Sequence, residues 1–310
     1  MAKVPVSFEW LSGCSGCELG IVDLHERLLT VLEAIEIIRL PILADIKDYP
    51  KAAVGVVTGA LRTKHDVECA EKMRESCDAI LAFGTCAVYG GPQGSGYAHT
   101  LRELAETAYI KNPTTVTDFI PDQGVPELLP EGVRPLDSAI NVDLYLPGCP
   151  PHAYYIFEAL VALVEGREPE FGPENVCNKC NRKMRHTEVA EIKRIHEVDI
   201  DPELCFLSQG IMCMGSATLD RCLAPCPRHG APCTGCGGPS ESVILEPQKD
   251  IRSEVATRMS MMTKIERDVI IANIEKQSKT FYAYAMASPI FRQKPTFLLR
   301  RWIGREGALS

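Results

Sequence analysis

Residues 4–19 read VPVSFEWLSGCSGCEL, an apolar run that ends in a glycine-rich turn with two cysteines. We predict a strand at Val4–Trp10, because this short apolar run is bounded by a turn signal. Leu19–Ile35 then carries apolar residues at helical spacing with charged residues between them, which predicts a helix. A strand, a tight turn and a helix in this order are typical of a parallel α/β sheet.

The same alternation continues to about residue 167. Helices are expected at His65–Glu75 and His152–Val164, whereas Asn112–Asp137 holds five prolines and is expected to be an irregular excursion. We therefore predict an α/β fold in which a parallel sheet forms an N-terminal domain of residues 1–167. The remaining strands are expected at Glu36–Leu40, Ala53–Thr58, Asp78–Phe83 and Asp143–Leu146.

The composition changes after Gly166. Residues 168–247 hold eight cysteines among glycine, proline and asparagine, with almost no periodicity. We expect this loop-rich domain, residues 168–250, to have no apolar core of its own and to be held by bound metal, because ligation free energy becomes folding free energy. Ser253–Ser278 has helical spacing, so terminal helices followed by a basic tail are expected in residues 251–310.

Twelve of the fourteen cysteines sort into three sets of four. Four thiolates suit a tetrahedral zinc, or an iron–sulfur cluster whose irons each take one terminal sulfur. A reducing compartment, in contrast, disfavours disulfides for so many cysteines. The first set is Cys14, Cys17, Cys86 and Cys149; the second set is Cys177, Cys180, Cys205 and Cys213; the third set is Cys222, Cys226, Cys233 and Cys236.

Every member of the first set follows the carboxyl end of a predicted strand, which is where open α/β sheets gather their ligands. We therefore expect residues far apart in the sequence to meet in one crevice, beside glycines that let backbone amides approach the sulfurs. The second and third sets begin or end with Cys-x-x-Cys, and their spacing leaves zinc open as an alternative to a cluster. Cys69 and Cys77 have no ligand spacing and are interpreted as buried thiols.

Composition excludes several classes of protein. A formal net charge of −8 and a pI near 5.5 argue against a nucleic-acid partner. The N-terminal residues show neither a secretory nor a twin-arginine signal, and no stretch approaches the roughly 20 apolar residues of a membrane span. We therefore expect a cytoplasmic protein with no membrane span.

The chain resembles the small, electron-transferring subunit of nickel–iron hydrogenases, and most of all that of the methyl-viologen-reducing (deazaflavin-non-reducing) hydrogenase of methanogenic archaea. The resemblance covers Trp10 to about Pro239. It rests on Cys14-Ser15-Gly16-Cys17, Gly84-Thr85-Cys86-Ala87, Pro147-Gly148-Cys149-Pro150-Pro151 and the order of the C-terminal cysteines.

This resemblance implies a flavodoxin-like N-terminal domain and three 4Fe–4S clusters: a proximal cluster on the first set, a distal cluster on the second set and a medial cluster on the third set. Cys177 stands where many relatives have histidine, and Cys226 stands where relatives with a three-iron medial cluster have proline. The fourth thiolate thus implies a complete cubane of lower potential.

The resemblance also implies that the chain supplies no catalytic residue to its oxidoreductase complex. Electrons from dihydrogen, split on a separate large subunit, would pass from the proximal to the medial to the distal cluster. They would then reach a low-potential acceptor such as heterodisulfide reductase, through a small iron–sulfur adaptor subunit. A complex I-like cluster subunit is disfavoured, because this chain has no adjacent cysteine pair.

A zinc-stabilised interaction module and a free-standing ferredoxin-like carrier remain the alternatives. Glu18 is interpreted as complementing a helix dipole rather than moving protons. His186 and His229 are expected near the cysteine sets without being ligands. The tail from Pro289 onward carries five cations and one acid among apolar residues, so it is either solvated or a docking segment for another subunit.

Overall fold

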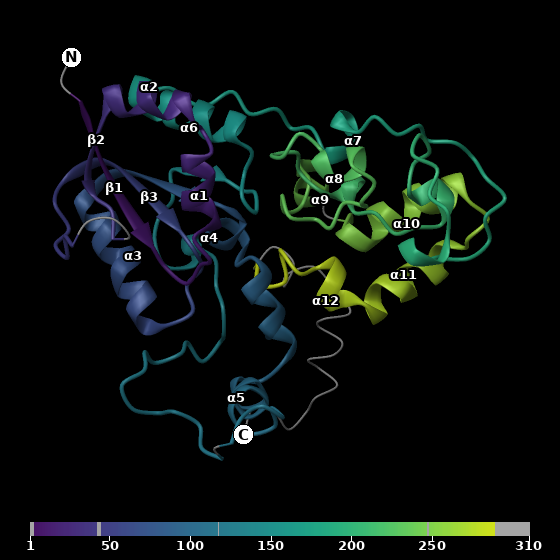
Figure 1. Ribbon diagram of the computed structural model, residues 1–310, viewed down its shortest axis with the longest axis horizontal. Coiled ribbons are helices and arrows are strands. Elements are labelled where there is room, and N and C mark those ends of the chain that lie inside the picture. Colours follow the sequence, from purple (N-terminus) through teal and green to yellow (C-terminus); the bar gives the residue numbers. More distant parts are fainter. Residues whose placement is uncertain (1–2, 42–44, 117, 247, 289–310) are drawn as a thin grey trace.

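The computed structural model describes residues 3–41, 45–116, 118–246 and 248–288, so the basic tail predicted from Pro289 onward lies outside the described residues. A five-stranded parallel sheet with the order β2-β1-β3-β4-β5 forms the N-terminal part (Figure 1). This is the flavodoxin-like order of doubly wound sheets, so the predicted α/β class is confirmed. The strands are β1 (Val4–Trp10), β2 (Ile35–Arg39), β3 (Ala52–Thr58), β4 (Cys77–Phe83) and β5 (Leu144–Leu146).

All five strands lie where the sequence predicts them, with each boundary within one residue. The central strands β3 and β4 are apolar on both faces, because helices cover a parallel sheet from both sides. Val56 and Leu81 are buried under one layer of helices, whereas Val57 and Ile80 are buried under the other layer.

Helices α1, α2 and α6 cover one face of the sheet and α3 covers the other face (Figure 1). The single helix predicted for Leu19–Ile35 is wrong, since the chain forms two helices there. The interruption lies at His25, whose φ of 51° cannot continue a right-handed helix, and the preceding Leu24 is buried in the core. The bounds are α1 (Gly16–Val22), α2 (Glu26–Ala34), α3 (Lys64–Ser76) and α6 (Ala153–Glu165).

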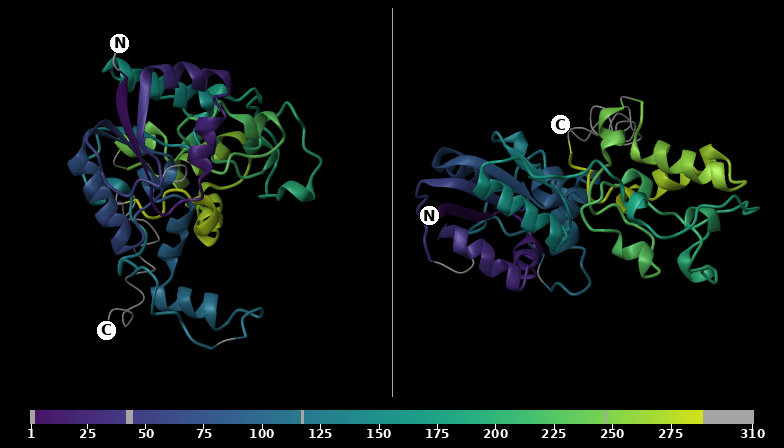
Figure 2. Two further views of the ribbon diagram at one scale, coloured as in Figure 1. Left: turned by 60° about the vertical axis from the view of Figure 1, so that its left-hand side comes forward. Right: turned by 90° about the horizontal axis from the view of Figure 1, so that it is seen from above.

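A long excursion separates β4 from β5. Its helix α5 has no buried residue and projects from the body of the molecule (Figures 1 and 2). The described part of Asn112–Asp137 is irregular, as predicted, apart from the start of a short 3-10 helix, and isolated bridges such as Leu61–Arg134 connect it to the sheet domain. The elements are α4 (Thr85–Tyr89), η1 (Pro92–Ala98), α5 (Leu101–Tyr109) and η2 (Leu136–Ser138).

The loop-rich part does have an apolar core, so the expectation that metal alone holds it is wrong. Phe206, Leu207 and Met214 are buried there and belong to one cluster with Val255 and Met259 of α10. Periodicity gave no sign of this core, because its apolar side chains come from loops and single turns. The short elements are α7 (Val176–Lys179), η3 (Ile195–Glu197), η4 (Leu207–Gln209), η5 (Gly215–Ala217), α8 (Pro225–Arg228) and α9 (Glu241–Leu245).

The predicted terminal helix Ser253–Ser278 is also divided. An extended backbone at Thr263 ends α10 (Ile251–Met262), and α11 (Arg267–Lys276) and α12 (Ser278–Phe281) follow. Since one core joins residues 176–243 with these helices, the boundary predicted at residue 250 does not separate two cores. The boundary at residue 167 stays a prediction.

The end of the described chain returns to the sheet domain. Ala287 is fully buried with Ala60 and Val133. It packs so closely on Gly90 and Gly94 that a Cβ atom on either glycine would lie within 2.8 Å of the Ala287 Cβ. Among the helices of the described ranges, none combines the length and apolarity that crossing a membrane requires.

Candidate functional site

The structure brings the four cysteines of the first set together at the carboxyl edge of the sheet. Cys14 lies on the turn from β1 to α1, Cys17 lies in the first turn of α1, Cys86 lies in the first turn of α4, and Cys149 follows β5. Together with Trp10 and other residues they line a cavity of about 70 Å³. Burial, followed by repulsion from Cys149 and Cys14, raises the pKa of the Cys86 thiol to about 11.

Two glycines, Gly84 and Gly91, lie so close to sulfur atoms of the first set that a side chain at either position would collide with them. Gly84 has a φ of 87°, and a Cβ atom there would lie 2.2 Å from the Cys17 Sγ. Gly91 is similar, since its Cβ would lie 2.5 Å from the Cys86 Sγ. Two amide-to-carbonyl hydrogen bonds of 2.8 Å, from Gly84 to Leu146 and from Thr85 to Gly148, hold the β4 and β5 turns against each other.

Glu18 also lines this cavity. Its Oε1 accepts a hydrogen bond from the Thr58 hydroxyl. Its Oε2 is buried without a hydrogen-bond partner among the described residues. The sequence could not predict the contact with Thr58, because it joins residues 40 positions apart.

The second set gathers beside α7 and α10. Burial and then the neighbouring thiols of Cys213, Cys205 and Cys180 raise the pKa of Cys177 to about 12. A Cβ on Gly215 would lie 3.2 Å from the Cys177 Sγ, a tight contact that a shift of a few tenths of an ångström would relieve.

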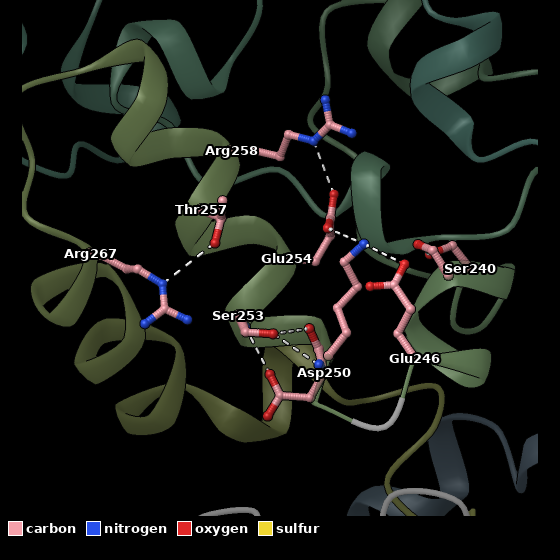
Figure 3. Close-up of polar contacts among 10 residues, drawn as sticks. Ser240, Glu246, Asp250, Ser253, Glu254, Thr257, Arg258 and Arg267 are labelled. Carbon is pink, nitrogen blue, oxygen red and sulfur yellow. Dashed lines mark hydrogen bonds and ion pairs between the residues drawn. The ribbon is translucent and has the colours of Figure 1, made fainter.

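A cation stands near the second set. The charge of Arg258 on α10 offsets part of the increase that burial causes in the pKa of Cys177. The Arg258 Nε lies 3.0 Å from Glu254 Oε1, and the Lys249 Nζ lies 3.3 Å from the other oxygen of Glu254 (Figure 3). The carboxylate of the buried Glu254 thus lies between two cations, Arg258 and Lys249.

The cysteines of the third set have neighbouring thiols in both of the other sets. Burial, followed by repulsion from Cys222, Cys149 and Cys226, raises the pKa of Cys236 to about 12. Burial also raises the pKa of Cys233, and the nearby thiol that contributes most to this increase is Cys213 of the second set. Cys236 contributes less, so Cys233 lies between the two sets.

These contacts give the order of the three sets in space. The carbonyl of Cys236 in the third set accepts a hydrogen bond of 2.6 Å from the Thr85 hydroxyl, which itself accepts one of 2.8 Å from the Gly148 amide, next to Cys149 of the first set. At the other side, the amide of Cys233 donates a hydrogen bond to the Cys213 Sγ at 3.2 Å. The third set therefore lies between the first and second sets, although it comes last in the sequence.

Of the other residues singled out in the sequence, His229 lies beside the third set, because its amide donates to the Cys226 carbonyl at 3.1 Å. The Nδ1 atom of His186 lies 3.2 Å from the Met261 carbonyl, and His229 is exposed. Cys69 and Cys77 are buried, and the Cys69 Sγ lies 3.5 Å from the His65 ring. In the described part of the chain, no three Cys, His, Asp or Glu side chains converge closely enough for a single metal ion. A cluster needs less convergence, because each of its irons takes its own sulfur.

Comparisons with known proteins find one family model and several hydrogenase subunits that are similar to this chain. The family model of the NADH ubiquinone oxidoreductase 20 kDa subunit matches residues 14–163. A subunit of the vhu F420-non-reducing hydrogenase of Methanocaldococcus jannaschii is 40% identical over 242 residues, which are 78% of this chain and 84% of the relative.

Two further proteins cover different shares of the chain. The iron-sulfur subunit of the F420-non-reducing hydrogenase of Archaeoglobus profundus is 34% identical over 315 aligned positions, with 92% of this chain and 96% of the relative covered. A solved structure of an NAD+-reducing nickel–iron hydrogenase in the H2-reduced state has a chain that is 31% identical, with a TM-score of 0.52. The match covers 55% of this chain and 96% of that one.

Proposed function

Because this chain belongs to the family of small electron-transfer subunits of F420-non-reducing nickel–iron hydrogenases, we propose that its three cysteine sets hold three 4Fe–4S clusters. The first set would hold the proximal cluster, the third set the medial cluster and the second set the distal cluster. Bound clusters would supply reversible one-electron transfer at each position.

The residues present fit such clusters. Each set offers soft thiolate donors, which iron–sulfur clusters require. Burial and mutual repulsion raise the pKa values of Cys86, Cys177 and Cys236, so four thiolates at one site need the positive charge of bound iron to offset their repulsion. Gly84 and Gly91 leave space beside Cys17 and Cys86, where a Cβ atom would lie 2.2 Å and 2.5 Å from the sulfurs.

The observation that carries the proposal is the order of the sets in space. The Thr85 hydroxyl connects the Cys236 carbonyl with the amide of Gly148, next to Cys149, and the Cys233 amide donates to the Cys213 Sγ. The third set is therefore the middle station for electrons that enter at the first set and leave at the second set. A fourth thiolate at Cys226 supports a complete cubane in the middle.

We further propose that the large subunit covers the first set. Trp10, Leu19 and Val22 are large apolar residues that are 42–61% exposed around that end of the sheet, and Cys14 is exposed as well. Exposed apolar groups beside a functional site mark a protein interface. Electrons would leave from the second set towards a low-potential acceptor, which we take to be a heterodisulfide reductase reached through a small iron–sulfur adaptor. All fourteen cysteines are free, which suits a reducing, cytoplasmic setting.

Elemental analysis of anaerobically purified protein tests the proposal. Three cubanes predict about twelve irons and about twelve acid-labile sulfides per chain, with a nickel-containing large subunit that co-purifies. About eight irons plus zinc would assign zinc to the second or the third set. Zinc without colour would overturn the proposal in favour of an interaction module, and electron transfer by the chain alone at the full rate would favour a free carrier.

A further inference from the structure

Thr85 connects the turns that carry the first and third sets. It directly precedes Cys86, and it is 1% exposed. Its hydroxyl accepts a hydrogen bond of 2.8 Å from the amide of Gly148, which directly precedes Cys149. The same hydroxyl donates a hydrogen bond of 2.6 Å to the carbonyl of Cys236 in the third set. One buried hydroxyl thus contacts the backbone next to two ligands of the first set and the backbone of one ligand of the third set.

We propose that Thr85 is a positioning residue that fixes the distance between the first and third sets and completes a hydrogen-bonded path for electrons between them. This inference rests on the proposed function, since the electrons require clusters at both sets. With clusters bound at both sets, one electron would pass from the reduced group held by the first set to the oxidised group held by the third set. No covalent bond forms or breaks, and the hydroxyl keeps its proton.

The geometry favours this role over simple space filling. Electrons tunnel more readily through bonded atoms and short hydrogen bonds than across gaps, and 2.6 Å is at the short end of the O–H···O range. Thr85 and Gly148 also exchange a second hydrogen bond, because the Thr85 amide donates to the Gly148 carbonyl at 2.8 Å. The hydroxyl is therefore held in place from the first set and points to the third.

The other junction of the chain of clusters is built differently. Between the third and second sets, the backbone amide of Cys233 donates directly to the Cys213 sulfur. A side chain can be changed by mutation, whereas that amide cannot. The junction at Thr85 is thus open to a direct test.

The test compares Thr85→Val, which keeps the shape and removes the hydroxyl, with Thr85→Ser, which keeps the hydroxyl. Thr263→Val is the matched control, because the buried Thr263 hydroxyl also donates to a backbone carbonyl, of Met259 at 2.8 Å, and accepts from an amide, of Ile265 at 3.3 Å. Each variant is purified in its complex. We would measure four quantities: the iron content, the hydrogen exchange of the Gly148 amide, the magnetic coupling between clusters and the rate at which electrons reach the third set.

We expect Thr85→Val to exchange the Gly148 amide about five- to tenfold faster, as loss of one hydrogen bond predicts. Its magnetic coupling should weaken and electron arrival should slow, while Thr85→Ser and Thr263→Val match the wild type. If Thr85→Val loses iron and Thr85→Ser restores it, the positioning role is supported. Wild-type exchange and electron arrival in Thr85→Val, or equal losses in Thr85→Ser, would overturn the inference. Zinc in the wild-type protein would instead refute the proposed function, and the exchange rate of Gly148 would still report on the contact.

Discussion

If the three sets hold clusters as proposed, replacing Gly84 by alanine should remove the cluster of the first set while those of the other two sets remain. A Cβ at this position would lie 2.2 Å from the Cys17 Sγ, whereas ordinary contacts between heavy atoms are about 3.5 Å or longer. The sulfur would have to retreat by about 1.3 Å, the difference between these two distances. Metal sites tolerate deviations of only about 0.2 Å in their bond lengths, so the displacement exceeds the tolerance several times over.

The backbone adds a second effect. Gly84 has a φ of 87° and a ψ of 156°, a region used almost only by glycine, and a side chain there costs about 1–3 kcal/mol. Gly166→Ala is the control for a side chain placed at a positive φ without a clash, although Gly166 lies in the milder αL region, with a ψ of 29°. Gly166 also has a positive φ, 67°, but no atom lies within 4 Å of the place that its Cβ would take. This control variant should lose roughly 1 kcal/mol of stability and no iron.

The assay is iron and sulfide content per chain after anaerobic purification, together with the magnetic resonance spectrum of the reduced protein. Gly84→Ala should fall from about twelve irons to about eight, with loss of one cluster signal. Gly166→Ala should keep all signals. If Gly84→Ala retained the full iron content and the spectrum of the wild type, ligation by Cys17 at this site would be refuted.

Three further variants test other parts of the molecule. The buried Glu9 Oε2 lies 2.9 Å from the Arg39 Nη1, so Arg39→Met removes the cation that pairs with this carboxylate. Urea unfolding should show a loss of about 3–5 kcal/mol in the free energy of unfolding, which adding Glu9→Gln should partly restore. An unchanged unfolding midpoint in Arg39→Met would contradict this. Cys226→Pro should convert the cluster of the third set to a three-iron form with a new paramagnetic signal when oxidised, and an unchanged spectrum would exclude Cys226 as a ligand. Met259→Ala empties a fully buried position of α10 and should lower stability by about 2–5 kcal/mol, with faster proteolysis in residues 176–243, whereas the exposed Met261→Ala should do neither.

The sheet could be predicted from the sequence because its strands are buried on both faces. A short continuous apolar run such as Ala52–Thr58 is typical of a strand buried on both faces, and its end coincides with a glycine turn. The division of Leu19–Ile35 into two helices could not be predicted, because the apolar spacing continues through the turn at His25. The C-terminal core was missed for a related reason. Residues such as Phe206 and Met214 enter it from single turns, which have no period to detect.

The candidate site was predictable in part. Because all four cysteines of the first set follow carboxyl ends of predicted strands, the sequence predicts that they share one crevice, and the structure brings them together there. The position of the third set between the other two was implied by resemblance alone, since sequence order would place it last. Thr85 could not be found from the sequence, because the carbonyl that it contacts is 151 residues away.

The packing of Ala287 on Gly90 and Gly94 sets an order of events during synthesis. Domains fold from the N-terminus as the chain emerges, so the sheet and all four ligands of the first set are available once Cys149 has left the ribosome. The segment that covers the turn after Cys86 follows roughly 7–28 s later at about 5–20 residues per second. During this interval the sheet domain already holds the four cysteines of the first set, but Gly90 and Gly94 still lack their contact with Ala287. The last packing contact of the sheet domain therefore comes from the final helical part of the chain and forms only after that part has been synthesised.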